Sequence, residues 1–177
     1  CKLIMGQSPS SETYNYEGIG MPFFQGKKEF GEVSPTVEKY CTAPKKIALP
    51  GDILMSVRAP VGPTNISNIK CCIGRGLAAI RPNQTNTTTE FLINYLKYFE
   101  FEISKKGKGS TFSAIKKGDL EETIVLLPTL KQQKLLSIFF DNIFKDFQQT
   151  QSKLEQQLAY LKQLKSSILS KAFKGEL

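Results

Sequence analysis

Hydrophobic and polar residues follow different patterns on the two sides of residue 128. Before it, short apolar runs alternate with glycine and proline turns, at residues 2–5, 53–57, 70–73, 77–80 and 123–127. Runs of this length beside turn-forming residues predict β-strands. Residues 89–103 instead carry apolar residues at helical spacing, behind a threonine cap at Thr87 or Thr88. Residues 1–128 are therefore predicted to form an α+β domain with a mostly antiparallel or mixed sheet.

The segment after residue 128 repeats every seven residues and contains almost no helix breaker. All nine prolines occur at or before Pro128, and residues 130–174 contain neither proline nor glycine. Thr129 and Gln132 fit a capping box, and a helix from there to about Phe173 would be roughly 65 Å long at about 1.5 Å per residue. The heptad positions are Phe140, Phe147, Leu154, Leu161 and Ile168, followed four residues later by Phe144, Gln151, Leu158, Lys165 and Ala172.

This spacing predicts the seam of a coiled coil, with two polar members, and such a seam needs a partner helix. The residues expected at a helix–helix interface are Phe140, Phe144, Phe147, Leu154, Leu158, Leu161 and Ile168. The alternative is that the helix folds back onto the first domain. The predicted architecture is thus a mixed-sheet domain, residues 1–128, followed by one long coiled-coil-forming helix, residues 129–177.

Composition excludes several kinds of chemistry. The 177 residues include no histidine, which removes a histidine base, a histidine metal ligand and a Ser-His-Asp triad. The four cysteines form no C-x-x-C pair, so neither a zinc site nor a disulfide framework is expected. No apolar run reaches the roughly 18 residues that a membrane span needs. A cytoplasmic protein without catalytic or metal-binding residues is the expectation.

Enzyme motifs are equally scarce. The stretch from Gly74 to Ala79 matches the G-x-G-x-x-A dinucleotide fingerprint, but Ile80-Arg81-Pro82 follows where a helix should begin. We interpret it as a turn at the edge of a strand. The sequence contains no P-loop, and no lysine lies two residues after an acidic residue, as the common nuclease pattern requires.

Basic segments point to nucleic acid instead. The formal net charge is +8, and residues 104–117 contain five lysines and no acidic residue. Glycine, hydroxyl and lysine side chains in one loop suit close approach to a phosphate backbone. Arginine commonly reads guanine, which makes Arg58 and Arg75 the better candidates for base reading, although Arg58 could equally be a structural pin. The predicted DNA-binding residues are Lys27, Lys28, Arg58, Arg75, Lys105, Lys106, Lys108, Ser110 and Thr111; a solvated loop is the alternative for residues 104–117.

Motifs along nearly the whole chain resemble one family, the DNA-specificity (S) subunits of type I restriction–modification systems. Residues 6–9, 51–62 and 72–80 look like a target recognition domain of that family. The stretch Leu127-Pro128-Thr129-Leu130-Lys131-Gln132-Gln133 looks like the junction to its helical region, and residues 167–177 look like that region's usual ending. The order of these motifs makes the resemblance specific.

The resemblance implies a non-catalytic subunit that binds double-stranded DNA and recruits methyltransferase subunits, which carry the S-adenosylmethionine; it leaves open whether a restriction subunit is also present. Complete specificity subunits carry two recognition domains and two helical regions. This sequence has one of each, so we expect a natural half-subunit or a fragment of a longer chain. A half-subunit would rebuild the pair as a homodimer through antiparallel C-terminal helices. The rival interpretations are a non-catalytic coiled-coil adaptor with a protein-binding head, and a small transferase or nuclease.

Overall fold

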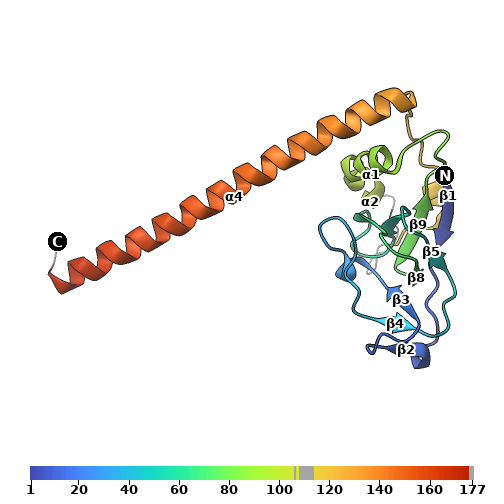
Figure 1. The fold of residues 1–177 in the computed structure, drawn as a ribbon, viewed down its shortest axis with the longest axis horizontal. Coiled ribbons are helices and arrows are strands. Elements are labelled where there is room, and N and C mark those ends of the chain that lie inside the picture. The colour runs from blue at the N-terminus through green and yellow to red at the C-terminus, as the bar shows by residue number, and fades with distance from the viewer. Residues whose placement is uncertain (106, 108–113, 176–177) are drawn as a thin grey trace. The chain divides into compact units, whose positions relative to one another are not determined.

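The structure, a computed structural model, describes residues 1–105, 107 and 114–175 (Figure 1). The chain divides into two compact units, Cys1–Leu136 and Ser137–Leu177. The strands are β1 (Lys2–Met5), β2 (Tyr14–Asn15), β3 (Met21–Phe24), β4 (Tyr40–Cys41), β5 (Ile47–Ala48), β6 (Ile53–Ser56), β7 (Thr64–Ile66), β8 (Cys71–Ile73) and β9 (Leu77–Arg81). The α-helices are α1 (Thr89–Tyr98), α2 (Glu100–Lys105), α3 (Lys117–Glu121) and α4 (Leu130–Lys174), and short 3₁₀ turns lie at Ser11–Thr13 and Lys27–Glu29.

Four strands form the central sheet of the first unit, in the order β1-β9-β6-β7, and every neighbouring pair is antiparallel. Side chains alternate between its faces because successive residues of a strand point in opposite directions. Ile53 and Met55 pack on one face with the helices, while Leu54, between them, packs on the other face with the second sheet. Both faces are covered, so β6 is apolar throughout except at its last residue.

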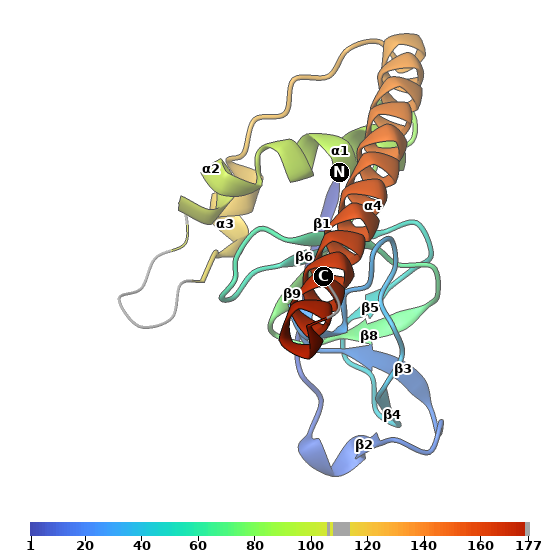
Figure 2. The same ribbon diagram turned by 90° about the vertical axis from the view of Figure 1, so that its left-hand side faces the viewer.

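The second sheet has the order β2-β4-β3-β8-β5 and is mixed, because β3 and β8 run parallel while its other pairs are antiparallel. Figure 2 shows the helices α1 and α2 on one side of the central sheet and the second sheet on the other. The α+β class with a mixed sheet is confirmed. Cys71 and Cys72 also point to opposite faces of β8, as consecutive strand residues must, and belong to different core clusters.

The helix predicted over residues 89–103 is present but is divided between α1 and α2. Thr88 is the N-cap, since its hydroxyl accepts a hydrogen bond from the Phe91 amide at 3.2 Å. The division falls at Phe99, whose backbone leaves helical geometry while its side chain stays packed on the core. Leu92, Leu96 and Ile103 nonetheless pack against the central sheet as the helical spacing predicted.

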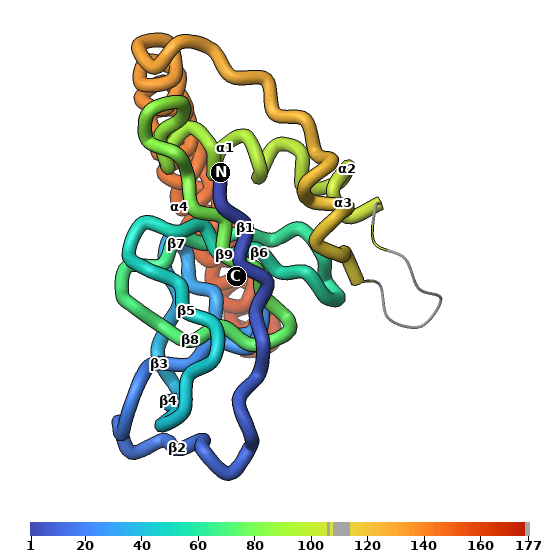
Figure 3. The backbone as a smooth tube through the Cα atoms, turned by 90° about the vertical axis from the view of Figure 1, so that its right-hand side faces the viewer, coloured from blue at the N-terminus to red at the C-terminus, as the bar shows by residue number. Residues whose placement is uncertain are grey.

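The strand predicted at residues 123–127 is wrong. This segment is extended but pairs with no described strand (Figure 3). Val125 alone packs against the core, while Ile124 and Leu126 are 82% and 75% exposed. β-Propensity identifies residues that suit a strand, but a strand also requires a neighbour with free backbone groups.

The long helix is confirmed: α4 runs without interruption from Leu130 to Lys174. Its capping box is present, with the Thr129 amide donating to Gln132 Oε1 at 3.1 Å and the Gln132 amide to Thr129 Oγ1 at 3.4 Å. Phe140 is half-buried, and the six other expected interface residues are 46–64% exposed, namely Phe144, Phe147, Leu154, Leu158, Leu161 and Ile168. No helix among the described residues is both long enough and apolar enough to cross a membrane.

Candidate nucleic-acid interface

Three of the predicted DNA-binding residues line one depression of about 340 Å³ on the first unit. Lys27 comes from the turn after β3, Arg58 from the loop after β6, and Arg75 from the tight turn between β8 and β9. The complete lining is Ser8, Gln25, Gly26, Lys27, Ser56, Arg58, Ala59, Arg75 and Gly76. It contains three cations and no acidic side chain, so the depression suits a polyanion.

Hydrogen bonds and a close backbone approach join the segments that line this depression. The Arg75 amide donates to Ser8 Oγ at 3.2 Å, and the Gly74 amide donates to the Phe24 carbonyl at 2.8 Å. A side chain at Gly76 would overlap the carbonyl oxygen of Gln25, so only glycine allows the two segments to approach this closely. The turn that resembles a dinucleotide fingerprint is thus a strand connection, as predicted, and it presents Arg75 from a fixed backbone.

The three arginines have different environments. Arg81 donates to both carboxylate oxygens of Asp52, at 2.7 Å each, and the Asp52 side chain is only 2% exposed. The hydrogen bonds to Asp52 raise the pKa of Arg81, and they occupy its guanidinium group. The exposed side chains of Arg58 and Arg75, in contrast, form no hydrogen bond or ion pair with any described residue. Their guanidinium groups are available to a ligand.

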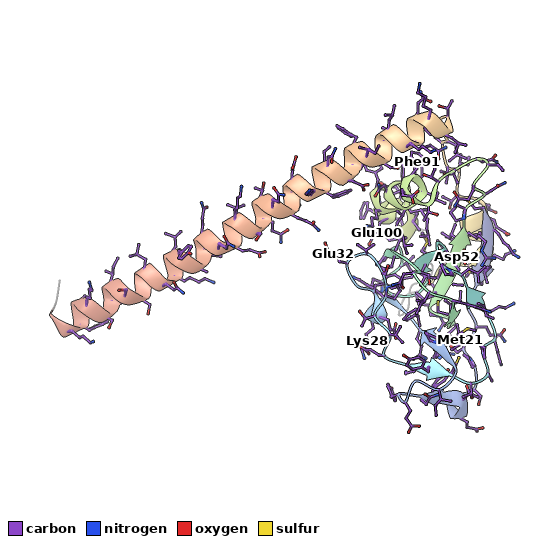
Figure 4. The ribbon with its side chains drawn as sticks, viewed as in Figure 1. Met21, Lys28, Glu32, Asp52, Phe91 and Glu100 are labelled. Atoms are coloured by element: carbon purple, nitrogen blue, oxygen red, sulfur yellow. The ribbon has the colours of Figure 1, made fainter. Side chains whose placement is uncertain are left out.

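The remaining predicted residues do not line the depression. Lys28 lies at an outer edge of the unit (Figure 4), and its Nζ is 3.9 Å from Oε2 of Glu38. Lys105 lies at the end of α2, with its ammonium 4.0 Å from the Phe101 ring centroid. Lys106, Lys108, Ser110 and Thr111 fall outside the described residues. Ala114, however, forms a β-bridge with Arg58, so one end of the basic segment is fixed beside the depression.

The predicted DNA-binding residues did not include three polar residues that line the depression, Ser8, Gln25 and Ser56, or Lys39 beside it. Ser8 and Gln25 line the depression, and Lys39 Nζ lies 2.8 Å from Gln25 Oε1. Gln25 directly precedes the Gly26-Lys27-Lys28 stretch, which was the only signal that could have drawn attention to it. Lys39 is 14 residues away along the chain and carried no signal.

Cys41, Cys71 and Cys72 are buried, and two of these thiols have raised pKa values. Burial raises the pKa of Cys41 to about 12, helped by neighbouring Cys72, and raises that of Cys71 to about 11. Thiols with such pKa values stay protonated and unreactive at neutral pH. Among the described residues, no three acidic or cysteine side chains are grouped as metal ligands.

Comparisons with known proteins agree with this geometry. Residues 1–160 match the model of the type I restriction modification DNA specificity domain. The chain is 48% identical over 136 residues to the type I restriction enzyme MjaX specificity subunit of Methanocaldococcus jannaschii, covering 77% of this chain and 32% of that protein. It is also 35% identical over 89 residues to the type I restriction enzyme EcoDI specificity subunit of Escherichia coli. That match covers 50% of this chain and 20% of that protein.

Solved structures give the same result. The HsdS subunit from Thermoanaerobacter tengcongensis is 48% identical, with a TM-score of 0.78, and the match covers all of this chain and 43% of that one. A chain from a study of assembly and conformational transition in a type I restriction–modification system is also 48% identical, with a TM-score of 0.93, and the match covers 44% of it. The chain therefore belongs to the type I restriction modification DNA specificity domain family. It spans less than half the length of these relatives.

Proposed function

We propose that this chain is a DNA-recognition unit of a type I restriction–modification complex and binds double-stranded DNA at one half-site. The acid-free depression carries this proposal, because it combines two unpaired arginines with a lysine. Membership of the specificity domain family supports it. Arg58 and Arg75 are assigned to base reading, and Lys27, Lys28 and the basic segment to phosphate contacts.

Chemistry is assigned to partner subunits. Methyl transfer is assigned to separate methyltransferase subunits, which would bind S-adenosylmethionine. A restriction subunit would be needed only if the complex also cuts DNA. We expect the complex to act in the cytoplasm, where its DNA substrate lies.

The partner of α4 is proposed to be the α4 helix of a second copy. Two antiparallel copies would bury the exposed seam and present two recognition units in opposite orientations, related by a twofold axis. The target would then be an interrupted palindrome, with an unread spacer between the half-sites.

A selection from a random-sequence duplex pool tests the proposed function. The full chain should enrich one sequence pattern, and Arg58→Ala or Arg75→Ala should relax discrimination at one base pair by about 1–3 kcal/mol. Addition of a type I methyltransferase subunit with S-adenosylmethionine should give methylation at the enriched site, whereas the chain alone should transfer no methyl group.

Two results would contradict the proposal. An adaptor protein with a protein-binding head would enrich no DNA sequence and would show no salt-dependent binding to random duplex. An enzyme would turn over as the purified chain without any partner. Unfolding of both arginine variants would instead assign Arg58 and Arg75 a structural role.

A further inference from the structure

Lys39 lies just before β4 and is held in place by three neighbouring side chains. Its ammonium lies 5.5 Å and 5.6 Å from the ring centroids of Tyr14 and Tyr16, and it donates a hydrogen bond of 2.8 Å to Gln25 Oε1. It forms no ion pair within the part of the chain that the structure describes. A surface lysine normally keeps its rotamer freedom, so this fixed cation needs an explanation.

The contact with Gln25 determines which end of the amide is available. An ammonium group can only donate, so the Gln25 atom that faces it must be the oxygen. Gln25 follows the buried pair Phe23 and Phe24, and its backbone packs tightly against Gly76. Rotation of the amide would bring its amino group toward the ammonium, where two sets of donor hydrogens would face each other.

We infer that Lys39 is a positioning residue, which fixes the Gln25 amide so that Gln25 reads a base as a hydrogen-bond donor. A free glutamine can read adenine by accepting from N6 and donating to N7. Here a base amino group approaching Oε1 would meet the positive charge of Lys39. The ligand of the Gln25 amino group is therefore an acceptor in the major groove, namely N7 or O6 of guanine, N7 of adenine or O4 of thymine.

This inference rests on the proposed function, since it concerns a base contact in the same depression. Gln25 and Arg75 line that depression together, and both side chains start from the backbone segments that Gly74 and Gly76 bring into contact. A donor-only glutamine beside an arginine would favour neighbouring base pairs that present acceptors. Lys39 itself does not line the depression, which separates its role from a direct base contact.

The experiment is a selection of bound duplexes from a random-sequence pool, performed with the full chain and with Lys39→Met. Methionine keeps an apolar stem against the tyrosine rings but cannot donate to Gln25. One base-pair position should lose its preference, from roughly tenfold to less than about threefold, as expected for one hydrogen bond. Lys45→Met removes the same charge from an exposed loop of the same unit and should leave every base preference unchanged.

Two further variants make the test specific to Gln25. Gln25→Glu should reverse the preference at the same position toward donor edges, because a carboxylate only accepts and pairs with the cytosine amino group. Lys39→Met in a Gln25→Ala background should cause no additional change in base preference. Lys39→Arg, which retains a donor and the charge, should restore most of the preference.

The outcomes separate the two levels of the proposal. If the unaltered chain enriches no sequence, the proposed function fails and this inference fails with it. If the unaltered chain is selective and Lys39→Met weakens all duplexes equally, with a salt slope about one unit flatter, Lys39 is a phosphate contact and the inference is wrong. Thermal unfolding of each variant identifies misfolding, and preserved selectivity in a folded Lys39→Met variant also overturns the inference.

Discussion

At the scale of single residues, the sequence identified the cations but not their partners. Arg58 and Arg75 were recognised as candidates for base reading, but no local pattern indicated that Arg81 is bound by Asp52, 29 residues earlier. Pairing over that distance depends on β6 and β9 lying side by side, which no local pattern reveals. Lys39 and Ser8 were missed because their contacts also join segments that are far apart in the sequence. Lys27, Arg58 and Arg75, in contrast, were recognisable from residue type and turn context.

The buried thiols lead to a prediction of pH dependence. Cys41 and Cys71 have pKa values of about 12 and about 11 in the folded chain, against 9.0 for an unperturbed thiol, chiefly because of burial. Between pH 9 and these folded-state values, the unfolded chain releases thiol protons that the folded chain keeps, so the contribution of the two thiols to stability falls as pH rises above 9. From pH 7.5 to 10, Cys41→Ala should lose about 1 kcal/mol less stability than the unaltered chain.

Denaturant unfolding at the two pH values, with a reductant present, measures this difference. Cys1→Ala removes an exposed thiol and serves as the matched control, with the pH dependence of the unaltered chain. Equal pH dependence in the Cys41→Ala variant and the unaltered chain would contradict the prediction.

At the scale of elements, local signals were reliable and non-local ones were not. The caps at Thr88 and Thr129 join atoms three residues apart, so the sequence shows both partners at once. The strand at residues 123–127 was wrong because its partner had to come from elsewhere. The burial of Gln133 was also not predicted, because it depends on segments that are distant in the sequence. A glutamine in an amphipathic helix gives no local indication that it is completely buried.

Gln133 connects the first turn of α4 to the segment before α1. Its Oε1 accepts from the Thr88 amide at 3.1 Å, and its Nε2 donates to the carbonyls of Asn86 and Pro128 at 2.9 Å and 2.8 Å. Gln133→Ala leaves these groups without their partner and should lower the free energy of unfolding by roughly 2–3 kcal/mol. Denaturant titration checks this, with Gln149→Ala, an exposed residue of the same helix, expected within about 0.5 kcal/mol of the unaltered chain.

The basic segment leads to a prediction about salt dependence. Replacing Lys105, Lys106 and Lys108 with alanine should weaken binding to every duplex and flatten the slope of log affinity against log salt by roughly 0.9 per lost phosphate contact. Base preferences should stay the same. Replacing Lys145, Lys153 and Lys162 on α4 removes the same charge, and an equal flattening there would show that only net charge matters.

At the scale of the whole molecule, the sequence predicted the architecture but not the strand order. Short apolar runs beside glycine and proline turns identified β6 and β9, and the heptad repeat identified α4 with nearly correct ends. The spacing of apolar residues along the chain indicates which faces of each element are apolar. It therefore predicts a layered α+β unit and a helix with an exposed apolar seam. The parallel pairing of β3 with β8 joins residues about 50 positions apart and has no local signature.

The seam of α4 leads to the last prediction. Leu154, Leu158 and Leu161 are 60%, 53% and 62% exposed, and burying them against a second α4 would remove this apolar surface from water. Sedimentation of the unaltered chain at micromolar concentration should show a dimer, and Leu→Ser at all three positions should weaken dimerisation at least about 100-fold. The variant should lose specific binding to the palindromic site but keep weak non-specific affinity. Serines at Gln149, Gln156 and Gln163, on the opposite face of the helix, should leave the dimer intact. A monomeric unaltered chain would contradict the two-copy proposal, and the seam would then be assigned to a second helix of a longer chain.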